Sequence, residues 1–248
     1  MTNDPLAPLL ELSGVAMACE QARDALGRAH RHPANLRDWP VTAAEAALRA
    51  ARASAVLDGG VLRLDVSAAG DPIFAGALRV AQALEGGQTS LVGVWQRAPM
   101  QALARLHMLA AAGQVDADQL GRPRVDADVA PRLELLADLV SGGTRAPAPV
   151  VAAVAHGELL TLGPFGSADG VVARAVSRLV TVATGLDPHG LGVPEVYWMR
   201  RGADYRDAAN GFATGTAEGV RAWVLLCCRA LQAGAREAVS IADAMARG

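Results

Sequence analysis

The chain has 248 residues, 52% of them hydrophobic and 4% aromatic, and its 23 basic residues nearly balance its 25 acidic ones. With a net charge of −2, nothing in the composition suggests the basic face that nucleic-acid binding needs, so we expect no nucleic-acid partner. Neither a run of about 20 apolar residues nor a signal-peptide pattern occurs, so we expect a cytoplasmic protein without a membrane partner.

The apolar residues are mainly Ala, Leu and Val, and strong helix formers of this kind predict an all-α protein. All basic residues are Arg, which is typical of a GC-rich bacterial genome. The absence of Lys excludes Schiff-base chemistry through a lysine amine.

In the first half of the chain, helix boundary signals predict helices over residues 6–30, 43–57, 71–84 and 99–112. Thr42 with Glu45 three residues later forms a capping-box pattern, and a polar loop precedes it. Asp58-Gly59-Gly60 ends the second helix, and Asp71-Pro72 begins the third. The alternating stretch 62–66 is too short to build a sheet.

In the second half, residues 116–131 are polar and irregular, and the expected helices cover residues 131–140, 150–162, 173–185 and 194–213. Thr216 then begins a final helix of about 30 residues, which is long for a globular protein. We expect an N-terminal helical region, residues 1–90, packed on a helical core, residues 91–248, around a central helix.

A glycine-rich loop leads into the helix expected over 173–185. It reads Gly163-Pro164-Phe165-Gly166-Ser167-Ala168-Asp169-Gly170-Val171 and continues to Arg174. The N-terminus of a helix carries free N–H groups and the positive end of the helix dipole, so this place suits an anion. The candidate anion-binding or nucleotide-binding residues are Ser167, Asp169, Gly170 and Arg174; as an alternative, Asp169 is a plain N-cap.

This loop resembles the signature of the Fic (Fido) family, which reads His-Pro-Phe, two spacers, Gly-Asn-Gly-Arg, two spacers and Arg. Pro164, Phe165, Gly170 and Arg174 match it. Other landmarks are similar: residues 103–109 resemble the family's Arg-x-Leu-His helix, residues 121–124 its Gly-x-x-Arg element, and residues 151–162 the helix before the signature. The resemblance covers residues 70–245 and implies the all-α fold of that family.

An upstream segment, residues 54–59, resembles the inhibitory motif of the same family. The resemblance implies that Asp58, near Ser54, pairs with Arg174 and keeps a nucleotide phosphate out. A carboxylate and a guanidinium form a strong, charge-assisted pair. Asp is one methylene shorter than the Glu of the family motif, so the expectation depends on a close approach of the two segments.

The groups that carry the family's chemistry are missing. Family members transfer AMP from ATP to a protein hydroxyl, and the position of their general base, a His, holds Gly163. Ser167 replaces the acidic Mg²⁺ ligand, and Val171 replaces the first Arg. His156 lies about two helical turns earlier and reads as a packing residue. Residues 125–130 are too few for the hairpin that holds target segments in active relatives.

We therefore expect a catalytically degenerate Fic-like protein, a pseudo-adenylyltransferase, that serves as a binding or regulatory module with an unknown protein partner. It would need no cofactor, and ATP, ADP or AMP would bind weakly. The first alternative is an active nucleotidyl or AMP transferase with an altered site. The second is a helical interaction module unrelated to nucleotides.

The three cysteines, Cys19, Cys227 and Cys228, lack the spacing of metal ligands. The adjacent pair lies in an apolar run, so both residues read as small buried hydrophobes. No Cys/His cluster predicts a metal site.

Overall fold

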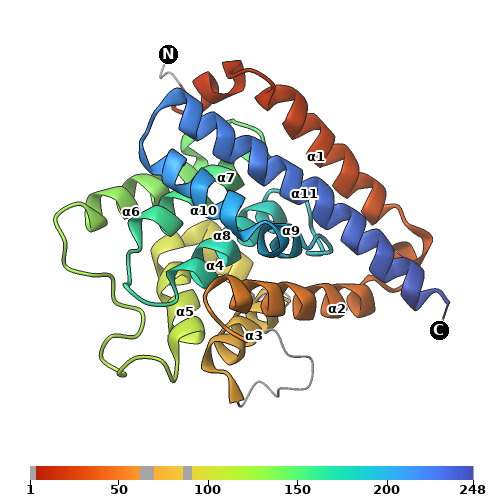
Figure 1. Ribbon diagram of the computed structural model, residues 1–248, viewed down its shortest axis with the longest axis horizontal. Helices are drawn as coiled ribbons and strands as arrows, with labels where there is room; N and C mark the ends of the chain where they lie inside the picture. Colours follow the sequence, from red (N-terminus) through yellow and green to blue (C-terminus); the bar gives the residue numbers. More distant parts are fainter. Residues whose placement is uncertain (1–3, 62–69, 86–90, 248) are drawn as a thin grey trace.

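The computed structural model describes residues 4–61, 70–85 and 91–247 (Figure 1). In these ranges the protein is all-α, as predicted, with eleven α-helices and no strand. In chain order they are α1 (Val15–His30), α2 (Pro33–Leu57), α3 (Pro72–Leu84), α4 (Leu91–Arg97), α5 (Pro99–Ala111), α6 (Val129–Asp138), α7 (Ala148–Leu162), α8 (Asp169–Ala183), α9 (Pro194–Arg200), α10 (Gly202–Ala213) and α11 (Ala217–Met245).

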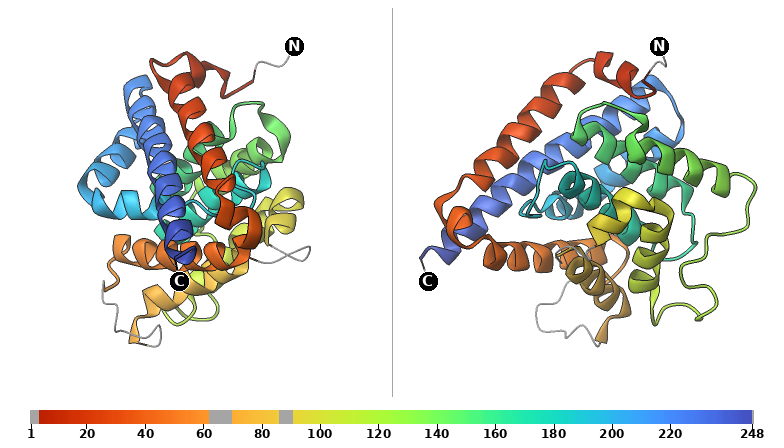
Figure 2. Two further views of the ribbon diagram at one scale, coloured as in Figure 1. Left: turned by 90° about the vertical axis from the view of Figure 1, so that its right-hand side faces the viewer. Right: turned by 180° about the vertical axis from the view of Figure 1, so that it is seen from behind.

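Helix α8 is the centre of the fold. It packs against α2, α3, α4, α5 and α7, and its residues from 171 to 177 are all buried. The long α11 forms a second axis, with α1 lying along it and α2, α7, α9 and α10 also in contact (Figures 1 and 2). The expected bundle around a central helix is therefore confirmed.

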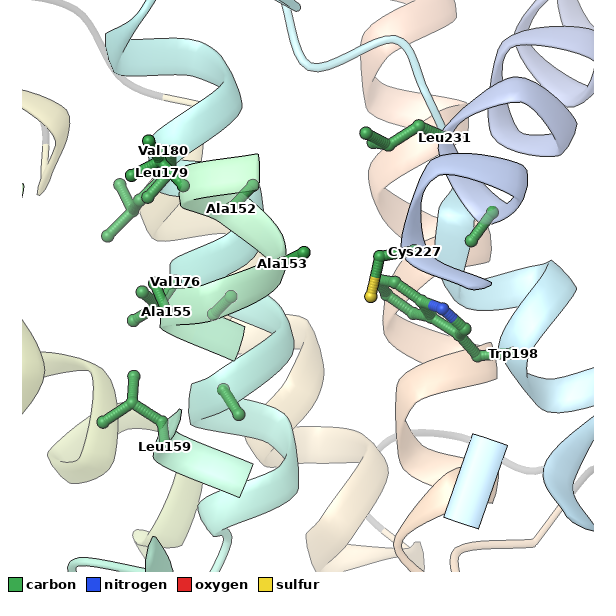
Figure 3. Packing of buried hydrophobic residues seen from close by; sticks show 14 of the residues in the cluster. Ala152, Ala153, Ala155, Leu159, Val176, Leu179, Val180, Trp198, Cys227 and Leu231 are labelled. Carbon is green, nitrogen blue, oxygen red and sulfur yellow. The ribbon is translucent and has the colours of Figure 1, made fainter. Parts of the chain in front are cut away.

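Small residues allow these helices to approach closely. Ala152, Ala153 and Ala155 of α7 are all buried (Figure 3), and α7 packs along α8, whose buried residues include Val176 and Val180. Helices with short side chains bury apolar area by bringing their axes close together rather than by filling a wide gap. Buried residues from both sides of residue 90 belong to one hydrophobic cluster.

Two predicted helix starts are confirmed by side-chain caps. The Asp71 carboxylate accepts hydrogen bonds from the N–H groups of Ile73 and Phe74 at the start of α3. The Thr216 hydroxyl accepts one from Gly219 N–H at the start of α11. Such bonds satisfy N–H groups that have no partner within the helix.

The predicted capping box at Thr42 is wrong. Residues from Pro33 onward are already helical, α2 is kinked at Asp38, and the Thr42 hydroxyl donates to the Trp39 carbonyl inside the helix. The first predicted helix is also interrupted, because Gly14 adopts a left-handed φ of 82°. Helix α4 was not predicted. The stretch 62–66 and the expected stop at residues 86–87 lie outside the described residues.

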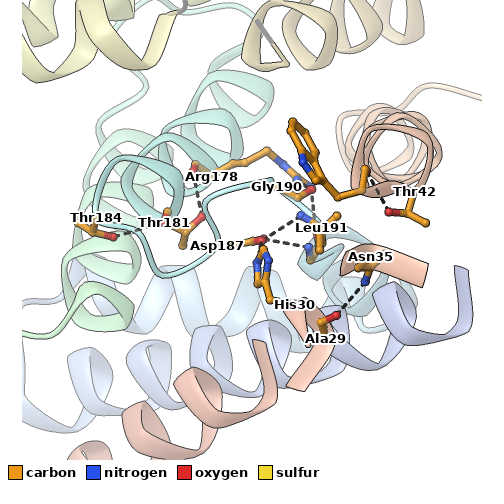
Figure 4. A network of polar contacts seen from close by, with 12 residues as sticks. Ala29, His30, Asn35, Thr42, Arg178, Thr181, Thr184, Asp187, Gly190 and Leu191 are labelled. Atoms are coloured by element: carbon orange, nitrogen blue, oxygen red, sulfur yellow. Dashed lines mark hydrogen bonds and ion pairs between the residues drawn. The ribbon is translucent and has the colours of Figure 1, made fainter. Parts of the chain in front are cut away.

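A buried carboxylate, Asp187, organises the loop between α8 and α9 (Figure 4). It accepts hydrogen bonds from the N–H groups of Leu191 and Gly192 at 2.9 Å and contacts His30 Nε2 of α1 at 2.7 Å. Burial opposes its ionisation, but the bonds from His30 and Gly192 outweigh this effect and hold the pKa of Asp187 below its ordinary value.

Acid is therefore expected to weaken the fold through Asp187. A lowered folded-state pKa stabilises the protein above the ordinary pKa near 3.8, and this contribution is lost as the pH falls through the folded value. Asp187→Asn should lower the free energy of unfolding near neutral pH by about 1–3 kcal/mol. Urea unfolding at neutral and acid pH should show a smaller acid-induced loss in this variant.

The exposed Asp243, which pairs with His32 at the surface, is the matched control. Asp243→Asn should leave the acid-induced loss close to that of the wild type, since exposed pairs contribute little. An Asp187→Asn protein with the same pH dependence as the wild type would contradict the assignment.

Candidate functional site

The glycine-rich loop connects α7 to the central helix α8 through three left-handed residues. Gly163 ends α7 with a φ of 54°, Gly166 has a φ of 74°, and Ala168 has a φ of 51° just before α8. Left-handed geometry is costly for a residue with a Cβ, so Ala168 marks local strain. A His at position 163, as in the Fic signature, would also have to adopt this conformation.

Asp169 is the first residue of α8 and does not cap it. Its Oδ1 accepts a hydrogen bond from Phe165 N–H at 2.9 Å, so the carboxylate faces back into the loop. Burial raises the pKa of Asp169 in spite of the hydrogen bonds from Phe165 and Gly166. The N-cap interpretation of Asp169 is wrong, and its side chain instead fixes the shape of the loop.

Ser167, which the resemblance to the Fic signature aligns with a metal-ligand position, contacts a neighbouring histidine. Its Oγ lies 3.0 Å from Nε2 of His107 on α5, and Nδ1 of the same ring accepts a hydrogen bond from Gly121 N–H. Nε2 therefore carries the proton and donates to Ser167. Burial lowers the pKa of His107, and its ring stacks on Phe165 with centroids 4.2 Å apart.

Arg124 fastens the loop from the other side. Its guanidinium donates to the carbonyls of Leu162 and Gly163 at 3.0 and 2.8 Å. The backbone N–H of Arg124 donates to the carbonyl of Pro164 at 2.7 Å. The carbonyl of Leu162, the last residue of α7, thereby gains a hydrogen-bond donor. Beyond Arg124 no strand forms before α6, and Val125 is fully exposed, so the prediction that this segment lacks a hairpin is confirmed.

The carboxylate of Asp58, the residue directly after α2, lies at the first turn of α8. Val171 N–H donates to Asp58 Oδ2 at 3.0 Å. Gly170 makes this approach feasible, since a Cβ there would lie 2.3 Å from Asp58 Oδ1. A carboxylate from the chain itself thus lies where the helix N-terminus would hold an external anion.

Arg174, one turn further along α8, is buried and reaches the same carboxylate. Its Nη2 donates to Asp58 Oδ1 at 2.6 Å and to the Ser54 carbonyl at 2.9 Å, and its Nε donates to Ser54 Oγ at 2.8 Å. The predicted contact of Asp58 with Arg174 is confirmed, and the bonds from Arg174 to Ser54 were not predicted. The shorter Asp side chain suffices because Gly170 lets α2 and α8 approach closely.

A buried network continues from Arg174 into the core. The Tyr205 hydroxyl lies 3.5 Å from Arg174 Nη1 and 2.7 Å from His156 Nε2. Burial, assisted by the charge of Arg174, lowers the pKa of His156 well below its ordinary value, and burial raises that of Tyr205. Both groups are therefore neutral near pH 7. The prediction that His156 packs in the core is confirmed.

A hollow of about 370 Å³ adjoins this network. Its polar lining residues, apart from the Asp58–Arg174 pair, are Thr161, Tyr205, Arg206 and Asn210. On the other side of Arg174 the space between α2, α3 and α8 shrinks to about 20 Å³. The start of α8 is therefore closed by Asp58 but borders an open hollow with a second guanidinium.

Sequence reasoning did not predict site roles for Tyr205, Arg206, Asn210, His107 or Arg124. The last two lie in segments 103–109 and 121–124, which sequence comparison with the Fic pattern did single out. Tyr205, Arg206 and Asn210 come from α10, and they have no motif in the sequence. Only the packing of α10 beside α7 and α11 brings them to Arg174.

The residues present do not suit Mg²⁺-dependent phosphoryl chemistry. Gly163 offers no base, Ser167 is bonded to His107, and Val171 is a buried apolar residue. The two nearby carboxylates are already bonded, Asp58 to Arg174 and Asp169 to the loop. A hard divalent cation prefers several free carboxylate or carbonyl oxygens, which this arrangement lacks.

Comparison with known proteins gives no match to any family model and no significant similarity to a curated protein. Across residues 4–61, 70–85 and 91–247, no helix is both long and apolar enough to cross a membrane.

Proposed function

We propose that this chain is a Fic-like protein without transferase activity, which serves as a binding or regulatory module. In this proposal Asp58 acts as an internal anion that occupies the phosphate-binding end of α8. The observation that carries it is the bridging position of the Asp58 carboxylate, which bonds both to Val171 N–H and to Arg174 Nη2.

The internal anion competes with any external one. An incoming phosphate would have to displace a carboxylate that already satisfies the helix N–H and the buried guanidinium, so nucleotides should bind weakly. The absence of a base at Gly163 and the bonding of Ser167 to His107 support loss of catalysis. The loop then keeps only its scaffold role, held by Arg124 and Asp169.

The wild-type protein is expected to transfer no labelled AMP from ATP, with or without Mg²⁺, to itself or to lysate proteins. Calorimetric titration with ATP, ADP and AMP should give weak binding at most. Transfer of labelled AMP that is abolished by Arg174→Ala would contradict the proposal and favour an active enzyme.

Removing the Asp58 carboxylate should produce a gain of anion binding, which tests the same proposal. Asp58→Ala leaves the Arg174 guanidinium and the α8 N–H groups without their carboxylate. Inorganic phosphate should therefore bind this variant at least about tenfold more tightly than the wild type and raise its melting temperature more. The exposed Asp204, on α10, provides the control variant Asp204→Ala, which should respond to phosphate like the wild type.

A further inference from the structure

Two cysteines from opposite ends of the chain face each other between α1 and α11. Cys19 Sγ and Cys228 Sγ lie 3.9 Å apart, although 209 residues separate them in the sequence. The two helices run side by side along most of the length of α1 (Figure 1). Both residues are buried, with exposed fractions of 4% and 0%.

The third cysteine provides a built-in comparison. Cys227 is adjacent to Cys228, but successive residues on a helix point about 100° apart, so its side chain lies on another face of α11. It is buried near Trp198 in the core (Figure 3), and burial raises the pKa of its thiol well above the ordinary value. Only the Cys19–Cys228 pair is within sulfur contact distance among the described residues.

Cys19 is reached from a hollow that Cys228 does not line. This hollow, of about 930 Å³, lies between α1, the start of α2 and the loop after α8, and its lining includes Cys19, Glu20, His30 and Trp39. Figure 4 shows the neighbourhood of His30 at one end of it. A small oxidant in the hollow would therefore meet Cys19 first.

The contact makes the two thiols chemically unequal. The sulfur contact with Cys228 lowers the pKa of Cys19, whereas the same contact together with burial raises the pKa of Cys228. The thiolate is the nucleophile toward peroxides, so Cys19 is the more reactive sulfur. The Cys228 sulfur, 3.9 Å away, is placed to attack an oxidised Cys19 and form a disulfide with it.

We propose that Cys19 and Cys228 form a peroxide-oxidisable dithiol whose disulfide links α1 to α11. The Cys19 thiolate attacks hydrogen peroxide and breaks its O–O bond, which gives a sulfenic acid and, after proton transfer, water. Cys228 then loses its proton, attacks the Cys19 sulfur and expels a second water. Two thiols are oxidised and one peroxide is reduced, so the step balances.

Formation of the bond requires the two sulfurs to approach each other from 3.9 Å to about 2.05 Å, the length of a disulfide bond. The bond would fix α1 on α11 and close a long loop of the chain. A cross-link of this kind restricts the unfolded state and stabilises the folded one.

The folded protein, treated with a small excess of hydrogen peroxide, is expected to lose two of its three thiols. Peptide mapping without reductant should find the Cys19–Cys228 disulfide, and the melting temperature should rise by about 5 °C or more until reductant is added. No thiol loss, or a disulfide that involves Cys227, would overturn the proposal.

Two substitutions separate the roles of the sulfurs. Cys227→Ala should still form the disulfide at the wild-type rate. Cys228→Ala should instead leave Cys19 as a sulfenic acid that a dimedone probe labels. Labelling of Cys19 to the same extent in the wild type would show that Cys228 does not resolve it.

A matched pair of variants tests whether peroxide reaches Cys19 through the hollow. Ala16 lines the hollow, whereas Met17 is exposed and does not line it. Ala16→Trp should slow oxidation several-fold, and Met17→Trp should leave the rate unchanged. Equal rates in the two variants would overturn the assignment of the hollow as the path to Cys19.

Discussion

Replacing Arg174 with Met is expected to lower the free energy of unfolding by about 3–5 kcal/mol. The guanidinium is 2% exposed and holds both Asp58 and Ser54, so its removal leaves a partly buried carboxylate without its cation. Met keeps most of the apolar volume, which separates loss of the ion pair from creation of a cavity. Urea unfolding monitored by circular dichroism measures the change.

The exposed Arg229 on α11 is the matched control, since Arg229→Met should change stability by no more than about 0.5 kcal/mol. A double-mutant cycle with Asp58→Asn isolates the pair. Each single variant leaves a charged partner uncompensated, so the two losses should be coupled by about 1–3 kcal/mol. Strict additivity would show that the contact contributes little and would weaken the inhibitory interpretation.

The Gly76→Ala substitution is expected to destabilise the protein by about 3 kcal/mol, which corresponds to a melting temperature lower by about 6–12 °C. Gly76 lies where α3 crosses α5, and a Cβ there would be 2.0 Å from the Ala110 carbonyl oxygen. The obstacle is backbone of another helix, so the helices must separate. Thermal unfolding of the purified variant measures the effect.

Gly27→Ala in α1 is the control substitution, because no backbone of another helix obstructs an added Cβ there. Its added Cβ would meet only the flexible end of Arg31, with Nη1 3.2 Å away. Because Ala is the better helix former, this variant should be neutral or more stable by up to about 1 kcal/mol. If both glycine substitutions had the same effect, close helix packing at Gly76 could not be the cause.

Local signals predicted most of the helices, because caps act between residues that are neighbours in sequence. Asp71 and Thr216 bond to N–H groups within three residues, so their role could be inferred without knowing the packing. Thr42 carried the same type of signal and failed. The residues before it are helical and its hydroxyl already bonds to Trp39, an arrangement supported by contacts of α2 with α1 and α9.

The site was predicted in part. Matching Asp58 and Arg174 to a known pattern anticipated their contact, but it did not explain how a short Asp side chain could reach or that Arg174 also bonds to Ser54. The structure supplies the reason, since Gly170 leaves no Cβ between Asp58 and the helix. The roles of Asp169 and Ser167 could not be inferred, because their partners depend on the shape of the loop and on His107.

The sequence by itself therefore determined the all-α class and most helix boundaries, because these depend on residue type and on neighbours along the chain. The tertiary structure alone decided what occupies the start of α8, which residues of α10 border Arg174, and that Cys19 meets Cys228. Each of these is a contact between distant segments, and its geometry follows from how closely small side chains let the helices pack.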